Sequence, residues 1–230
     1  MGLDWLPGNK PKPEHEEEYM EILRTLDEGS QSEDKGFFAR LFSSKPDKKI
    51  DEEALIERFQ EISIPAFETL GAPRVGYDKG ANEWILQKRE EHNPEIPEEE
   101  WLKHHHGYYV LDLAPPCDGL PRYSNAPMGY VEAYAFRAKF LEDCTDIIGE
   151  ERFARGYERM TAPDLVAYGR ELIGYAESWA AEHGVDIAAM NPDSEDFDLE
   201  SPEGKTDIVL SAGRWCVYWG ERGHILDPYY

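Results

Sequence analysis

Apolar residues recur at helical spacing over much of the second half of the chain. The clearest helix follows Thr161, an N-cap residue with Pro163 and Asp164 close behind it, and ends before Gly184 as a stop signal. Its apolar stripe consists of Leu165, Leu172, Ile173, Ala176 and Ala180. Shorter stripes predict two preceding helices, over residues 131–141 and 153–160. These patterns together predict a helical body.

The first half of the chain carries fewer apolar stripes. Tyr19, Ile22, Leu23 and Leu26 predict a helix over residues 14–26, and Leu55, Phe59 and Ile62 predict another that starts at Asp51. Residues 71–95 are rich in Gly, Pro and Asn, which favours a loop. Pro97 then opens a short helix that ends in three histidines before Gly107.

Strand signals are few and do not alternate with the helices. Residues 108–113 (YYVLDL) form the best strand candidate, and 208–219 (IVLSAGRWCVYW) predict a hairpin with Trp215, Val217 and Trp219 on one face. The predicted fold class is therefore α+β: a predominantly helical single domain with a small, mainly antiparallel sheet and an N-terminal arm.

The arm is expected to comprise residues 1–50, with one helix and a basic linker, and the main α+β domain residues 51–230. The linker segment KGFFARLFSSKPDKK (residues 35–49) is the one basic stretch of the sequence. We expect it to dock on the acidic body of the same chain, and attachment to a membrane surface is the alternative.

Composition narrows the function classes. The 230 residues include 48 acidic and 24 basic ones, so the formal net charge is −24, which argues against nucleic acid as a partner. No apolar run is long enough for a membrane span, and the start shows no secretory signal. The three cysteines form no CxxC pair, which favours a cytoplasmic protein with reduced thiols.

The triple histidine suggests a metal site. Glu100 and His104 lie four residues apart on one helical face, and with His106 they are the candidate ligands of a transition metal such as zinc. A purely structural interpretation also fits, because acids at the start and histidines at the end of a helix suit its dipole. A pH-sensitive contact is a third interpretation.

The loop over residues 114–128 is a second candidate site because it directly follows the predicted strand. Cys117 is a candidate nucleophile, Asp118 a base or further metal ligand, and Arg122 a holder of anions. Tyr123, Ser124 and Asn125 complete the loop's polar set. The alternative is that the prolines of this loop only stiffen a long connection, and that Cys117 is buried as a small apolar residue.

Two functional hypotheses follow. The first is a soluble acidic cytosolic protein that binds a protein partner, perhaps a basic one, without catalysis, because an acidic surface speeds encounter with basic partners. The second is a small metal-assisted hydrolase with its site between the His104–His106 helix end and the Cys117–Asn125 loop. Phosphate-loop, dinucleotide and serine-hydrolase motifs are absent from the sequence. Substrate, partner identity and oligomeric state stay open.

Overall fold

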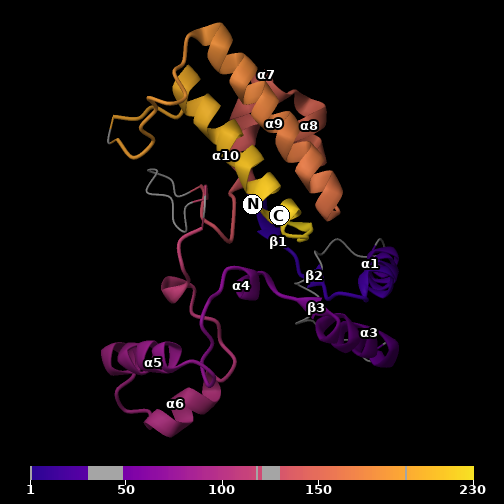
Figure 1. Cartoon of the computed structure of the whole chain (residues 1–230), viewed down its shortest axis with the longest axis vertical. Coiled ribbons are helices and arrows are strands. Elements are labelled where there is room, and N and C mark those ends of the chain that lie inside the picture. Colours follow the sequence, from indigo (N-terminus) through magenta and orange to yellow (C-terminus); the bar gives the residue numbers. More distant parts are fainter. Residues whose placement is uncertain (1, 31–48, 118, 121–129, 195) are drawn as a thin grey trace. The chain divides into compact units, whose positions relative to one another are not determined.

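The computed structural model (Figure 1) describes residues 2–30, 49–117, 119–120, 130–194 and 196–230. Its α-helices are α1 (Glu16–Ser30), α3 (Lys49–Glu61), α4 (Ala66–Thr69), α5 (Lys79–His92), α6 (Glu98–His104), α7 (Thr145–Ile148), α8 (Glu150–Arg155), α9 (Ala162–His183) and α10 (Pro202–Glu221). Short 3-10 helices are η1 (Leu111–Leu113) and η2 (Ala138–Cys144), and the strands are β1 (Asp4–Pro7), β2 (Lys10–Pro11), β3 (Ser63–Ile64) and β4 (Leu226–Tyr229). The fold is predominantly helical α+β with small antiparallel sheets, as predicted.

The chain divides into two compact units. One comprises Met1–Ile64 with Asp118–Tyr230, and the other comprises Pro65–Cys117. The expected boundary between arm and body, at residue 50, adjoins a segment outside the described residues and stays a prediction. The same holds for the docking of the basic linker, since residues 35–48 lie outside the description.

A small sheet joins distant parts of the larger unit. β1 pairs with β4 antiparallel, with Trp5 opposite Pro228 and Leu6 opposite Asp227. Isolated bridges extend the sheet on both sides, from Trp5 to Phe136 and from Leu226 to Met160. Trp5 is fully buried on the inner face, and its Nε1 donates to the carbonyl of Gly156 (2.8 Å). The inner face therefore belongs to the core.

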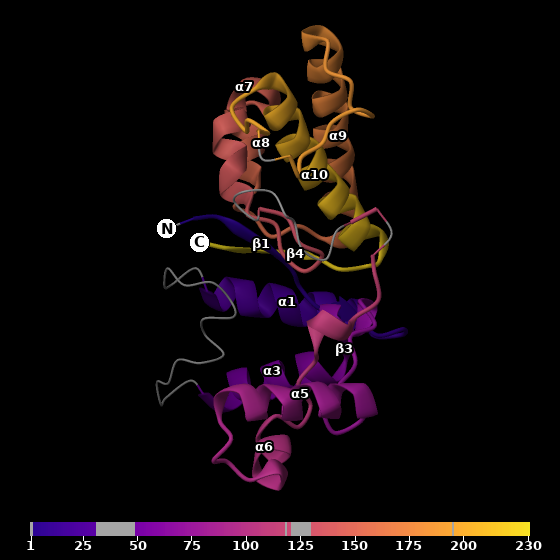
Figure 2. The ribbon, with the colours of Figure 1, turned by 90° about the vertical axis from the view of Figure 1, so that its left-hand side faces the viewer.

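Helices α9 and α10 pack against that inner face. Trp5 lies 6.0 Å from Trp215 of α10 and 5.9 Å from Tyr168 of α9, ring centre to ring centre. The two helices run side by side in both views (Figures 1 and 2) and approach closely because Gly169 and Gly213 face each other. This aromatic and glycine-lined contact is the centre of the larger unit.

Helices α1 and α3 pack together on the opposite side of the sheet, where Figure 2 shows α1 beside β1 and β4. Tyr19 stacks on Phe59 at 4.9 Å, and both join a buried cluster that includes Ile225, just before β4. Strands β2 and β3 pair at the base of the two helices. The part of the sheet near Ile225 is thus enclosed between two helix pairs.

The smaller unit has its own apolar cluster of Val75, Ala81, Ile85 and Val110, against which Trp84 and Trp101 pack. Helix α5 supplies Ala81 and Ile85 four residues apart. The prediction of a loop is wrong for residues 79–92, because two buried residues one helical turn apart are enough to hold a helix when a second helix covers them.

The predicted C-terminal hairpin is also wrong, since residues 202–221 form the continuous helix α10. Its residues are buried nearly all round, so the run lacks the polar face by which an amphipathic helix is recognised. Gly213, which suggested a turn, instead allows close approach to α9. Trp215 and Trp219 therefore lie one helical turn apart, and Val217 does not share their face.

Two other element predictions fail for the same reason, which is pairing between distant segments. Residues 131–136 form a tight turn rather than a helix, because Val131 bridges to Phe136 and Phe136 also bridges to Trp5, and 138–144 form a 3-10 helix. Within the predicted strand 108–113, Tyr109 makes a single bridge to Arg74 and residues 111–113 turn into η1. Local periodicity carries no information about such partners.

Candidate functional site

The predicted metal ligands lie at the surface of the smaller unit. Glu100 and His104 are exposed on α6, four residues apart on the helix as predicted, whereas His106 lies beyond the helix C-cap. The His106 ring packs beside Tyr77 at 5.2 Å and over Gly76. Within the described ranges, no group of three or more His, Cys, Asp or Glu side chains is arranged to hold a metal ion. Metal binding by Glu100, His104 and His106 stays a prediction without structural support.

The histidines instead take part in aromatic contacts. His105 packs on Trp101 at 4.3 Å, and its Nδ1 donates to the Trp101 carbonyl (2.9 Å). Nearby, the Arg74 guanidinium lies between the rings of Tyr77 (4.7 Å) and Tyr109 (5.1 Å). These contacts give the three-histidine segment a structural role in joining α6 to the neighbouring extended chain.

Of the residues predicted to act in catalysis, only Cys117 lies within the described part of the chain. Cys117 is half-buried and carries a free thiol. Asp118 and Arg122, together with Tyr123, Ser124 and Asn125, lie outside the described residues, so their predicted roles stay predictions. The other two thiols are buried, and burial raises the pKa of Cys144 to about 12 and that of Cys216 well above its ordinary value. Neither buried thiol is a ready nucleophile.

A polar surface that the sequence did not indicate runs across the outer face of the small sheet. Asp4 and Leu6 alternate with the buried Trp5, so they face away from α9 and α10. Their partners across the strands, Tyr229 and Asp227, lie on the same face. Two ion pairs cross this face, from Arg137 to Asp4 (3.3 Å) and from Arg159 to Asp227 (2.9 Å).

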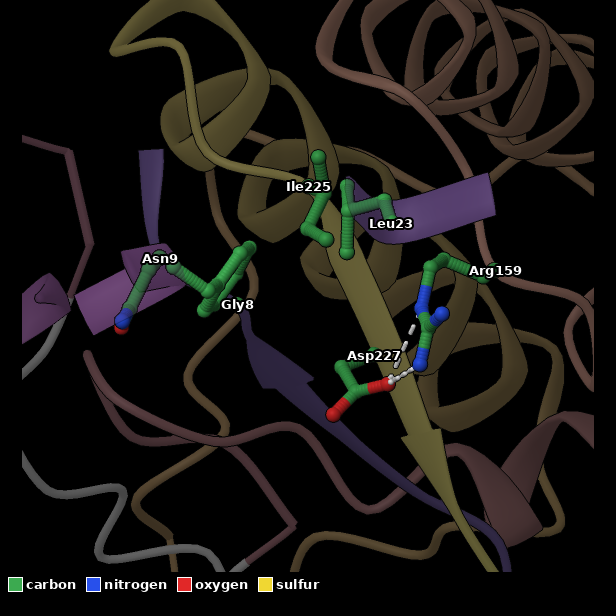
Figure 3. Close-up of a pocket in the computed structure, with 7 residues that line it drawn as sticks. Gly8, Asn9, Leu23, Arg159, Ile225 and Asp227 are labelled. Atoms are coloured by element: carbon green, nitrogen blue, oxygen red, sulfur yellow. Dashed lines mark hydrogen bonds and ion pairs between the residues drawn. The ribbon is translucent and has the colours of Figure 1, made fainter. Parts of the chain in front are cut away.

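One end of the outer face is closed by α1 and α3. A cavity of about 10 Å³ lies there between Leu23, Phe59, Ile225 and the Arg159–Asp227 pair (Figure 3), which is at the threshold for a single water. Beside it, the buried His224 donates from Nδ1 to the Gly8 carbonyl (2.7 Å), and burial lowers the pKa of His224 to about 4. This enclosed end is a structural polar cluster rather than a ligand site.

The other end of the outer face is open. A groove with a volume of about 210 Å³ lies there, which we call the open groove. It is lined by Asp4, Leu6, Tyr130, Glu132, Ala135, Arg137 and Tyr229. Small-molecule sites usually measure about 300–1,000 Å³, so the open groove suits a single side chain rather than a whole metabolite.

Glu132 distinguishes the open groove from the closed end. Partial desolvation raises the pKa of its carboxyl, and the charge of nearby Arg137 only partly offsets this. Arg137 itself is paired with Asp4, and Glu132 forms no ion pair among the residues that the structure describes. The open groove therefore holds an exposed carboxylate that is accessible to a bound cation.

The back wall of the open groove is fixed by α10. The Tyr130 hydroxyl donates to the carboxylate of Asp207, which is buried in the second turn of that helix. The Tyr130 ring also packs edge-on to Phe136 at 6.1 Å and against Phe140 at 5.3 Å. Tyr229, which also lines the open groove, is 55% exposed. The lining thus combines a buried tyrosine held by α10 with an exposed one.

Sequence reasoning missed this site because its residues come from three distant segments. Residues 131–141 were interpreted as a helix, which would have placed Glu132 and Arg137 on different faces. The one available signal was alternation of polar and apolar residues in DWLP and in LDPY, each four residues long. Such short runs occur by chance too often to predict a strand pair.

No helix in the described part of the chain is long and apolar enough to cross a membrane. No protein-family model, curated protein or solved structure matches this chain.

Proposed function

We propose that this protein binds a partner protein without catalysis, by taking a cationic side chain of that partner into the open groove. The observation that carries the proposal is Glu132, an exposed carboxylate in the lining of the open groove that has no ion-pair partner among the described residues. A cationic side chain placed there would form a charge-assisted hydrogen bond with it.

Net charge supports the same partner class. A formal charge of −24 speeds encounter with basic proteins and opposes encounter with nucleic acids and anionic surfaces. The accessible ring of Tyr229 adds a second attraction, because a cation over a tyrosine face gains about 0.5–1 kcal/mol at an exposed site. Tyrosine is also enriched among the residues that contribute most to protein–protein binding.

We further propose a cytoplasmic location. The three cysteines carry free thiols, and two of them are buried in the core of the larger unit. Compartments that maintain reduced thiols favour such a set.

The test is binding of a fluorescein-labelled oligo-arginine peptide, measured by anisotropy in low salt. Wild type is compared with Glu132→Gln and with Glu182→Gln, an exposed carboxylate on α9 outside the open groove. Both variants remove one negative charge. We expect Glu132→Gln to weaken binding about fivefold to tenfold, which corresponds to about 1–1.4 kcal/mol, and Glu182→Gln to change it less than twofold.

Equal effects of the two substitutions would mean that the peptide responds to net charge alone, and the proposal would then be wrong. Binding should also weaken as salt rises, because the contact is electrostatic. Affinity that does not change with salt would likewise contradict it.

A further inference from the structure

The lining of the open groove also bears on which cation it accepts, an inference that rests on the proposed function. Its lining includes two apolar side chains, Leu6 on the outer face of the sheet and Ala135 in the segment before η2, which we call the floor. It also includes two carboxylates, Asp4 and Glu132, which we call the rim, and the exposed side chain of Tyr229. A ligand must therefore present an apolar surface to the floor and hydrogen-bond donors to the rim.

We infer that the open groove is a guanidinium site, which accepts an arginine side chain of the partner in preference to lysine. Guanidinium is planar and weakly hydrated, so its faces can lie on Leu6 and on the Tyr229 ring while its edge donates to Glu132. An ammonium is a compact, strongly hydrated charge, and it would have to lose water over the same apolar floor.

The protein already holds one guanidinium in this setting. Arg137 lines the open groove, and its Nε donates to Asp4 Oδ1 at 3.3 Å. That pair occupies one of the two rim carboxylates and leaves Glu132 for a ligand. The volume of about 210 Å³ is enough for one side chain but not for a bulky multi-ring ligand. The geometry thus points to a single arginine, inserted from the side on which Tyr229 is exposed.

The experiment uses three capped amino acids as probes: N-acetyl-arginine, N-acetyl-lysine and N-acetyl-citrulline methylamides. Each is titrated into the isotope-labelled full-length protein, and the backbone amide shifts of Leu6 and Ala135 report occupancy of the open groove. We expect the arginine probe to bind at least fivefold more tightly than the lysine probe. Citrulline, which has the shape of arginine without its charge, should cause no saturable shift.

Two variants separate the contribution of the Glu132 carboxylate to probe binding from that of the Tyr229 ring. Glu132→Gln should abolish saturable shifts for both cationic probes. Tyr229→Leu removes an exposed ring and should weaken both cationic probes, the arginine probe at least twofold more than the lysine probe, because a planar guanidinium stacks on the ring as well as being attracted to it.

The failures of the two proposals are distinguishable. If arginine and lysine bind wild type equally and Glu132→Gln abolishes both, the preference for guanidinium is wrong and the binding role of the open groove stands. If Glu132→Gln leaves the shifts of all probes unchanged, or no probe causes a saturable shift at Leu6 and Ala135, both proposals are wrong.

Discussion

Two arginine–carboxylate pairs lie on the same sheet face but in different surroundings. The Arg159 and Asp227 side chains are 20% and 9% exposed, whereas those of Arg137 and Asp4 are 56% and 35% exposed. Water screens the second pair, so it adds less than about 1 kcal/mol to stability. Breaking the first removes the cation paired with a buried carboxylate beside the small cavity, and such losses typically cost about 3–5 kcal/mol.

The first prediction compares equivalent substitutions in these pairs. Arg159→Met should lower the free energy of unfolding by about 3 kcal/mol, because Asp227 then stays buried without its cation. Arg137→Met should lower it by less than about 1 kcal/mol. Urea unfolding followed by tryptophan fluorescence measures both. Similar losses in the two variants would show that burial does not separate the pairs.

At the scale of elements, the contact between α9 and α10 depends on the absence of side chains at three positions. A Cβ added at Gly213 would lie 2.7 Å from the carbonyl oxygen of Gly169, and one added at Gly169 would lie 2.7 Å from that of Gly213. At Gly220 it would lie 2.8 Å from the carbonyl oxygen of Ala162. Backbone atoms on both sides cannot move away as a flexible side chain would, so the helices themselves would have to separate.

The second prediction compares two glycines of the α9–α10 pair, one inside the helix contact and one outside it. Gly213→Ala should destabilise the protein by about 1–3 kcal/mol through overpacking, although alanine favours the helix. Gly174→Ala, on the exposed face of α9 with no atom within 4 Å of the added Cβ, should stabilise it by about 0.5–1 kcal/mol. Thermal unfolding of both variants measures whether each substitution lowers or raises the stability of the protein. A stabilising effect at Gly213 would contradict the close approach of the helices.

The same two elements show what sequence reasoning could reach. Helix α9 was predicted correctly because its signals are local: Thr161 at the N-cap, an apolar stripe, and Gly184 with φ +70° at the end. Helix α10 was missed because burial all round removed its periodicity, and because Gly213 serves a partner helix rather than a turn. A glycine that allows contact with a distant helix therefore gives a misleading turn signal when only its neighbours in the sequence are considered.

At the scale of the whole molecule, two buried ionisable groups respond to acid in opposite directions. Burial lowers the pKa of His224 to about 4, from an ordinary value of 6.5. Burial raises the pKa of Asp207 to about 6, from 3.8. Between pH 6.5 and 4 the unfolded chain protonates His224 while the folded one does not, so stability falls as the pH falls. Between pH 6 and 3.8 the folded chain protonates Asp207 first, so stability rises as the pH falls.

The third prediction follows because the pH responses of His224 and Asp207 nearly cancel in the wild-type protein. Asp207→Asn removes the stabilising response and leaves the His224 response, so the variant should lose about 2–3 kcal/mol more than wild type between pH 7 and 4. Urea unfolding at a series of pH values measures the difference, with Glu182→Gln as a control that should follow wild type. If Asp207→Asn follows wild type as well, Asp207 does not titrate in this range.

The sequence by itself determined the elements whose signals lie within one helical turn or at helix ends, namely α1, α6 and α9, and it determined the helical α+β class and the strongly acidic charge. Tertiary structure decided the rest. The β1–β4 pairing, the bridge from Phe136 to Trp5 and the assembly of the open groove each depend on contacts between segments more than 75 residues apart in the printed sequence. Which segments meet is set by burial of Trp5 and its aromatic neighbours, and that burial exists only once the chain has folded.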